Sequence, residues 1–384
     1  LNLAAEKLKG TKDKYGADSV AMFSSARVTN EENYLAQKFA RVVLGTNNID
    51  HYDRLCHSSS MAGIGAAFGI GAMSNTINDI GEDARAIFVI DSNITESHPI
   101  IGYKIKQTVR KNGAKLIIAA PRCTDLATMA DVHMQFRPGT GVALLNGMMN
   151  IIITEGLLDK EFIENRTENI EALKQILEKY TPEYVEPITG VPADDIRKAA
   201  RLYAESEASA IYYSMGQTPH STGTDSVKSV CNLAMLTGNV GRPGTGVNAL
   251  LGQNNIQGAY DMGCLPIVYP AYQAVTNNEI HDKFKKAWGL ALSGQNGLTA
   301  AQTIIAAHAG QIHGLFVLGE NPIVSDPDIQ HGEESLEKLE CLIVQDIFLT
   351  ETAQKADIVF PGLSFAEKEG TFTSTERRVQ LVRK

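Results

Sequence analysis

The sequence of 384 residues is poor in cysteine: there are five, and no two of them form a C-x-x-C pair. Without such pairs, a zinc ribbon or an iron–sulfur cluster inside this segment is not expected. An odd and scattered set also fits a reducing compartment better than a disulfide framework, so we expect a cytoplasmic location. For all but Cys56, the simplest interpretation of each cysteine is a small buried apolar residue.

Basic residues are not in excess, because 35 Lys and Arg stand against 44 Asp and Glu, a formal net charge of −9. A nucleic-acid partner needs a basic surface, so no nucleic-acid binding is expected. No apolar run of about 18 residues is present, and hence no membrane insertion is expected. No G-x-G-x-x-G follows a predicted strand and no P-loop occurs, so nicotinamide binding is not predicted.

Neither end of the sequence has the features of a natural terminus. There is no initiator methionine, and residues 1–7 have the pattern of an amphipathic helix rather than a signal peptide. Residues 377–384 end the chain in an apparent strand without a cap. We therefore expect both ends to be cuts in a longer protein.

Apolar runs alternate with helical segments along most of the chain. The predicted strands are residues 19–24, 86–90, 115–120, 208–213, 314–319, 341–345 and 357–360. The main predicted helices are residues 29–44, 99–113, 142–155, 159–180 and 193–204. This β-α-β order predicts parallel, doubly wound sheets, and the length is too great for one core.

Two stretches rich in small residues, 56–80 and 241–263, interrupt this alternation and are predicted to be loop-like. They divide the chain into an early piece, a middle α/β domain and a late α/β piece. Strands from the early and late pieces can belong to one sheet. The sequence is therefore compatible with a domain inserted into another domain.

Polar loops follow three predicted strands, at residues 91–99, 121–125 and 216–220. Ligands bind beyond the carboxyl ends of parallel strands, where helix N-termini and loop amides stabilise anions. As a set, these loops indicate an extended ligand that carries phosphates. Taken singly, each is equally well explained as an ordinary strand–helix connection.

Cys56-His57 lies at the junction between the early piece and the middle domain, in a predicted loop. A thiolate ligates soft or high-valent metals, and an adjacent imidazole can exchange a proton near neutral pH. The second small-residue stretch carries four side-chain amides, at Gln253, Asn254, Asn255 and Gln257. Amides at this density suit recognition of a polar heterocycle; the alternative is a solvated turn.

Several segments along nearly the whole chain resemble the molybdopterin oxidoreductases, and most closely the catalytic subunits of formate dehydrogenases. They occur in the same order as in that family. These segments are residues 54–63, 71–75, 77–80, 96–99, 233–239, 252–263 and 345–348. The resemblance implies two related three-layer α/β domains with parallel sheets, one inserted within the other. The discontinuous domain would comprise residues 1–52 plus 253–384, and the inserted Rossmann-like domain residues 53–252.

The resemblance also implies the chemistry. A molybdenum or tungsten bis-(molybdopterin guanine dinucleotide) would lie between the domains, with Cys56 as metal ligand and His57 assisting proton handling. Formate would be oxidised to CO2, or the reverse, and electrons would leave through iron–sulfur proteins or electron-transfer subunits. A 4Fe-4S cluster is expected in an N-terminal module, and a cofactor-capping domain at the C-terminus; both lie outside this sequence. The implied cofactor-binding residues are Asn93, Glu96, His98, Arg122, Gly216, Gln217, Gln253, Asn254 and Asp346.

Three positions depart from the family pattern. Leu251 stands where an arginine is expected to bind the carboxylate of formate, Asp91 where a loop begins with glycine, and Ala120 where an aspartate precedes Pro-Arg. Two alternatives therefore stay open beside the formate dehydrogenase. One is a cofactor-free scaffold or electron-wiring subunit with the same fold, and the other is a related pterin enzyme with a different substrate.

Overall fold

The computed structural model describes residues 1–384, except for the side chain of Glu82. It divides into unit 1, formed by Leu1–Arg54 with Gln253–Lys384, and unit 2, formed by Leu55–Gly252. The first junction thus follows residue 54 rather than residue 52, and the second follows residue 252.

Unit 1 contains strands β1 (Val20–Phe23), β2 (Ile49–Asp50), β8 (Val268–Tyr269), β9 (Gln273–Ala274), β10 (Gly314–Leu318), β11 (Cys341–Asp346), β12 (Ile358–Pro361), β13 (Gly370–Thr373) and β14 (Val379–Val382). Its helices are α1 (Asn2–Tyr15), α2 (Asn30–Phe39), α13 (Ile256–Asp261), α14 (Asn278–Trp288), α15 (Ala300–His308), α16 (Pro322–Ser325), α17 (Ile329–Glu337) and α18 (Glu351–Lys355).

Unit 2 contains strands β3 (Ala86–Ile90), β4 (Lys115–Ala119), β5 (Val132–Met134), β6 (Ser209–Tyr213) and β7 (Gly246–Ala249). Its helices are α3 (Arg54–Phe68, which begins at the junction), α4 (Asp79–Glu82), α5 (Ile94–Ser97), α6 (Pro99–Asn112), α7 (Gly141–Thr154), α8 (Lys160–Arg166), α9 (Ile170–Leu177), α10 (Pro182–Thr189), α11 (Ala193–Glu205) and α12 (Gly223–Leu236).

Each unit is built on a five-stranded parallel sheet, in the order β12-β11-β10-β1-β2 in unit 1 and β5-β4-β3-β6-β7 in unit 2. The two sheets match position by position: β10, β11, β12, β1 and β2 of unit 1 occupy the places of β3, β4, β5, β6 and β7 of unit 2. In each sheet the chain proceeds outward in one direction through the first three of these strands and in the opposite direction through the other two. Such a reversal opens a crevice at the carboxyl edge of a sheet, here between β10 and β1 and between β3 and β6.

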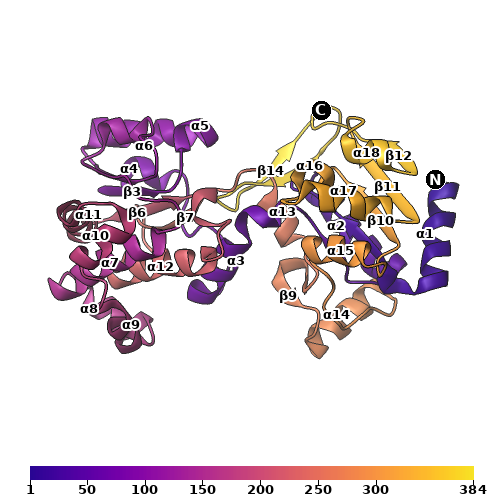
Figure 1. Cartoon of the computed structure of the whole chain (residues 1–384), viewed down its shortest axis with the longest axis horizontal. Coiled ribbons are helices and arrows are strands. Elements are labelled where there is room, and N and C mark those ends of the chain that lie inside the picture. Colours follow the sequence, from indigo (N-terminus) through magenta and orange to yellow (C-terminus); the bar gives the residue numbers. More distant parts are fainter. The chain divides into compact units, whose positions relative to one another are not determined.

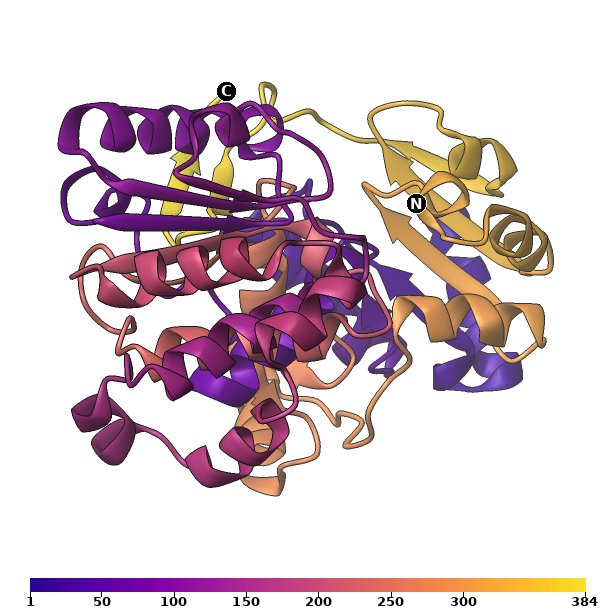
Figure 2. The same cartoon turned by 60° about the vertical axis from the view of Figure 1, so that its left-hand side comes forward.

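Side chains of the strands in unit 2 point alternately to the two faces of the sheet, and both faces are packed against helices. Phe88 and Ile90 join the core beneath α7, α11 and α12, whereas Ile87 and Val89 join a second core with α4 and α6. The two helix layers lie on either side of the strands (Figures 1 and 2). Strands buried on both faces read as continuous apolar runs, and this pattern is why they were predictable.

The sheet of unit 1 is also buried on both faces. Val20 packs with Leu8 of α1, and Met22 packs with Ala36 of α2. The alternate residues Ala21 and Phe23 point to the other face and are at most 1% exposed. The predicted class of two three-layer α/β units with parallel sheets is therefore confirmed.

Local interactions define both ends of α2. The Thr29 hydroxyl accepts from Glu32 N at 3.2 Å, and the Glu32 carboxylate accepts from Thr29 N at 2.7 Å, which together form a capping box. Such a cap stabilises a helix by about 1 kcal/mol. A π-helical turn extends the helix to Leu44, and Gly45 ends it at a φ of 81°.

The first of the two stretches predicted to be loop-like is largely helical, so the prediction was wrong for residues 56–80. Residues 54–68 form α3, in which Gly63 lies so close to α12 that an added Cβ would be 2.6 Å from Val227. The small residues therefore serve close packing rather than flexibility. The second stretch contains β7 and α13. The predicted helix over 159–180 is also two helices, α8 and α9, because Asn169 takes a left-handed φ of 60°.

No helix among the described residues is long and apolar enough to cross a membrane.

Candidate functional site

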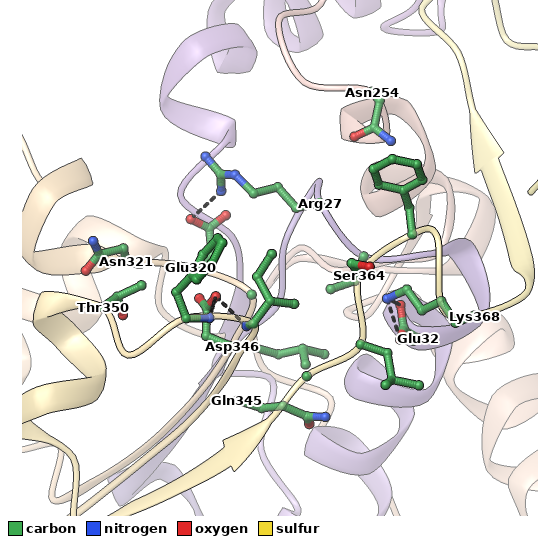
Figure 3. A pocket seen from close by; sticks show the side chains of 18 of the residues that line it. Arg27, Glu32, Asn254, Glu320, Asn321, Gln345, Asp346, Thr350, Ser364 and Lys368 are labelled. Atoms are coloured by element: carbon green, nitrogen blue, oxygen red, sulfur yellow. Dashed lines mark hydrogen bonds and ion pairs between the residues drawn. The ribbon is translucent and has the colours of Figure 1, made fainter. Parts of the chain in front are cut away.

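A cavity of about 600 Å³ lies in unit 1 where β1, β10, β11 and β12 end, and we call it the unit 1 crevice (Figure 3). Its size is typical of a small-molecule site. The polar side chains that line it are Arg27, Glu32, Asn254, Glu320, Asn321, Ser325, Gln345, Asp346, Thr350, Ser364 and Lys368. The apolar ones are Val28, Leu318, Val324, Ile347, Phe348, Leu363, Phe365 and Phe372. This mixture suits a flat, polar ligand.

Arg27 is the central cation of the crevice and is 49% exposed. Its Nη1 atom lies 3.0 Å from Glu320 Oε2 and 3.7 Å from Asp53 Oδ1. These three residues follow β1, β2 and β10, so the parallel sheet brings their segments to one edge. The half-exposed guanidinium is available to an anionic group of a ligand.

Glu320 is 2% exposed, and its Oε1 atom has no hydrogen-bond partner among the described residues. Burial raises the pKa of Glu320 well above its ordinary value; the nearby Asp53 adds to this effect, and Arg27 opposes it. A buried polar atom without a partner is costly, so Glu320 is a candidate for contact with a ligand.

The hairpin of β13 and β14 is fixed to the N-terminus of α2. Lys368 Nζ lies 2.7 Å from Glu32 Oε2 (Figure 3), and Thr371 N donates to Glu31 Oε2 at 2.8 Å. These contacts hold Phe372 and Lys368 at the wall of the crevice.

The predicted residues Asn254 and Asp346 both line the unit 1 crevice. Asn254 is exposed there, whereas Asp346 Oδ1 accepts from Ile347 N at 2.7 Å and so shapes its own loop. Gln253 is half-buried, and its Oε1 atom has no hydrogen-bond partner among the described residues, but it does not line the crevice. The structure thus brings together two of the three predicted residues in unit 1.

The other two amides of this stretch are structural. Asn255 is fully buried, donates to Val28 O at 2.8 Å and accepts from Thr373 N at 2.7 Å. Gln257 donates to Asp261 Oδ1 at 2.8 Å. The expectation that all four amides recognise a heterocycle therefore reduces to Gln253 and Asn254.

In unit 2, Cys56 is half-buried in the first turn of α3, not in a loop as predicted. The Thr218 hydroxyl donates to the Cys56 carbonyl, and Ser59 Oγ donates to Thr218 O at 2.9 Å. The start of α3 is thereby fixed to the segment after β6. A thiol held on a rigid helix end has a defined direction, as a metal ligand requires.

His57 interrupts the helical geometry of α3, with φ −136° and ψ 16°, and is fully buried. Its Nδ1 atom lies 3.0 Å from Ser60 Oγ, which in turn accepts from Tyr213 OH at 2.9 Å. Burial, with a smaller contribution from His98, lowers the pKa of His57 to about 4. The ring is therefore neutral at neutral pH, and its orientation is fixed.

The other predicted residues of unit 2 are more dispersed. His98 Nε2 lies 2.8 Å from the Leu251 carbonyl, and Asn93 caps the short helix α5 through its backbone carbonyl. Glu96 and Arg122 are exposed and make no side-chain hydrogen bond with any described residue. Only Gly216 and Gln217 come together, at the end of β6.

The crevice of unit 2 between β3 and β6 is closed, with a cavity of about 10 Å³. Asp91 takes a left-handed φ of 52°, and an added Cβ on Gly216 would lie 2.1 Å from the Asp91 carbonyl oxygen. Gln217 Nε2 donates to Asp91 Oδ2 at 3.2 Å, and Gln217 Oε1 accepts from the Ser226 hydroxyl. Burial raises the pKa of Asp91, against the effect of the Gln217 hydrogen bond.

Sequence reasoning missed Arg27, Glu320 and Lys368. A signal for two of them was present: in the middle domain, polar residues directly after a predicted strand were taken as candidate ligand-binding residues. By the same rule Arg27 closely follows the first predicted strand, and Glu320 immediately follows strand 314–319. Lys368 had no such signal, because it meets Glu32 only through the folded hairpin.

The two crevices differ in what they can hold. The unit 1 crevice fits a group of nucleotide size, with Arg27 for an anion and Glu320 Oε1 for a polar partner. The unit 2 crevice does not fit such a group as it stands. Among the described residues, no group of three or more His, Cys, Asp or Glu could hold a metal.

A model of the molybdopterin oxidoreductase family matches residues 1–384. The chain is 52% identical over 381 residues to the alpha subunit of F420-dependent formate dehydrogenase 1 of Methanococcus maripaludis, covering 99% of this chain and 56% of the relative. It is 53% identical over 384 residues to the alpha subunit of F420-dependent formate dehydrogenase of Methanocaldococcus jannaschii, covering 100% and 56%. The chain spans about half the length of these relatives. Acetylene hydratase from Pelobacter acetylenicus has a similar structure, with a TM-score of 0.80, 24% identity and coverage of 99% and 54%.

Proposed function

Because the chain belongs to the molybdopterin oxidoreductase family, we propose that it is the central part of a formate dehydrogenase alpha subunit, which oxidises formate to CO2 or catalyses the reverse. The observation that carries this proposal is 52% and 53% identity to formate dehydrogenase alpha subunits along the whole chain. The half-buried thiol of Cys56, next to a buried neutral imidazole, is compatible with this chemistry.

Membership of the family implies a molybdopterin cofactor. We propose the bis-(molybdopterin guanine dinucleotide) form with molybdenum or tungsten, which when bound supplies the two-electron acceptor. Cys56 would ligate the metal through its thiolate. The unit 1 crevice would hold one nucleotide arm, with Arg27 near a phosphate and Asn254 near the polar edge of the base. Gly216 and Gln217 would take part in holding a second arm once Gln217 leaves Asp91.

Oxidation of formate to CO2 releases one proton and two electrons, so a base is needed beside the metal ligand. The His57 ring is neutral and oriented by Ser60, so it can accept this proton in passing, while its lowered pKa favours release of the proton again. Its Nε2 atom has no hydrogen-bond partner among the described residues. Burial around His57 also excludes bulk water from the ring.

Two observations favour other functions. Leu251 offers no charge for a carboxylate, which favours a related pterin enzyme with a different substrate. The closed unit 2 crevice favours a cofactor-free scaffold or electron-wiring subunit. For the enzyme, we further propose a 4Fe-4S cluster in an N-terminal module, electron-transfer subunits as partners and a cytoplasmic location.

The proposal is tested by metal analysis of the full-length protein, expressed in a host that makes the pterin cofactor. We expect stoichiometric molybdenum or tungsten, and a loss of formate oxidation of more than about a hundredfold in Cys56→Ala. Cys123→Ala, at an exposed cysteine of unit 2, is the matched control and should keep full activity. His57→Ala should lower turnover while metal content stays. A folded protein without stoichiometric metal would contradict the proposal.

A further inference from the structure

Two buried carboxyl groups share one guanidinium on the floor of the unit 1 crevice. Asp53 and Glu320 are each 2% exposed, and both lie against Arg27 Nη1, at 3.7 and 3.0 Å. Two carboxylates and one cation leave an excess negative charge in a place that water hardly reaches. One proton bound to the pair removes this excess.

The hydrogen bonds indicate which carboxyl carries the proton. Asp53 Oδ2 accepts from Ala26 N at 2.7 Å, so this oxygen already has a hydrogen-bond donor. Glu320 has Arg27 on Oε2, whereas its Oε1 atom has no hydrogen-bond partner among the described residues. Burial raises the pKa of Glu320, in agreement with this assignment.

Neighbouring groups do not supply a second counter-charge. Those that face the pair from the other elements are His51, Asp50, Arg54, Tyr52, Asp326 and Asp346. His51 Nδ1 lies 3.9 Å from Asp53 Oδ2, but burial lowers the pKa of His51 to about 4 and keeps the ring neutral. Arg54 pairs with Asp50 at 3.4 Å, and Tyr52 donates to Asp326 at 2.5 Å.

We infer that Glu320 is a neutral acid in the free protein, and that binding of a phosphate-bearing nucleotide in the unit 1 crevice is linked to this proton. The nature of the ligand rests on the proposed function. With Glu320 protonated, Arg27, Asp53 and Glu320 carry no net charge, so a phosphate beside Arg27 meets no excess negative charge. With Glu320 ionised, the same three groups carry a net negative charge, and the phosphate is repelled.

The sign of the pH dependence follows. Below the pKa of Glu320 the nucleotide binds without proton exchange at this residue. Above it, binding takes up one proton, and affinity falls by up to about tenfold per pH unit. Glu320→Gln is neutral at every pH and keeps an N–H donor, so its affinity should stay at the low-pH value of the unchanged protein.

The test is calorimetric titration of GMP into the full-length protein, prepared without pterin cofactor, at several pH values and in two buffers of different ionisation enthalpy. The difference between the unchanged protein and Glu320→Gln cancels the titration of the phosphate itself. Glu334→Gln, at an exposed carboxyl of α17, is the matched control and should keep proton uptake. Arg27→Gln should weaken binding by at least about tenfold.

Three results would overturn the inference: no GMP binding by the folded protein, the same proton uptake in Glu320→Gln, or weaker binding by Glu320→Gln at every pH. The last result would mean that Glu320 acts as an ionised acceptor.

If Glu320→Gln does not fold, Asp53→Asn serves as the test variant. It leaves one carboxyl for Arg27, so it should move proton uptake to a lower pH or abolish it. Unchanged proton uptake in Asp53→Asn would overturn the inference. Proton-linked GMP binding without metal in the expressed enzyme would sink the proposed function alone. Stoichiometric metal with GMP binding independent of Glu320 would sink this inference alone.

Discussion

The two crevices have the same strand order but different contents. In both units the residue that follows the central strand of the sheet has a left-handed φ. This φ is 64° for Gly319 after β10 and 52° for Asp91 after β3. An asparagine stands two residues later in each, Asn321 and Asn93, followed by a four-residue helix. Glycine leaves the unit 1 crevice open, whereas the side chain of Asp91 occupies that of unit 2. The fold demands the backbone turn, and the residue that makes it decides the available space.

The largest effect is expected where this turn meets the neighbouring strand end. Gly216→Ala would place a Cβ 2.1 Å from the Asp91 carbonyl oxygen, and backbone must move to relieve the contact. We expect a loss of at least about 3 kcal/mol in the free energy of unfolding, measured by denaturant titration. Gly10→Ala, where an added Cβ meets nothing within 4 Å, should be neutral or stabilising. Equal stabilities of the two variants would show that unit 2 is not closed as described.

Exchanging the two turn residues should exchange the properties of the crevices. Gly319→Asp would bring a Cβ to 3.0 Å from Val28 and a carboxylate into the unit 1 crevice, so GMP affinity should fall by at least about tenfold.

Asp91→Gly should create a second GMP site with little change in the free energy of unfolding, because relief of left-handed strain offsets the added freedom of the unfolded chain. Calorimetry gives the number of sites. Asn169→Gly, at an exposed left-handed position, controls for backbone effects and should leave that number unchanged.

The smallest effect is expected at the rim of the unit 1 crevice. Lys368→Met removes the contact with Glu32, which lies partly in solvent, and should cost about 0.5–1 kcal/mol. Thermal unfolding monitored by circular dichroism would measure it. Lys9→Met, which breaks an exposed pair with Asp13, should cost less than this. A larger loss in Lys9→Met would mean that the hairpin is not held through Lys368.

Much of the fold was predictable because strands such as β3 and β6 are buried on both faces and read as apolar runs. Strand β5 has three residues, and β7 lies within a glycine-rich stretch, so neither had a pattern to detect. Helix α3 was missed because residues chosen for close packing resemble those chosen for flexibility.

The site was only partly predictable. Asn254 and Asp346, which the family resemblance implied as cofactor-binding residues, both line the unit 1 crevice. The charge balance of that crevice could not be predicted from the sequence. Arg27, Asp53 and Glu320 lie far apart along the chain and come together only when the sheet of unit 1 forms. The closure of unit 2 could not be foreseen either, since it depends on the backbone angle of Asp91.

The interrupted course of unit 1 has a consequence for the growing chain. Val20 of β1 pairs with Gly314 of β10, the central strand of this sheet, so β1 waits for a partner that is synthesised after the whole of unit 2. Unit 2 is contiguous and can complete its own sheet first. Until β10 leaves the ribosome, the apolar edge of β1 is open to wrong pairing. The insertion therefore sets an order of folding, in which the half with the closed crevice is finished before the half with the open one.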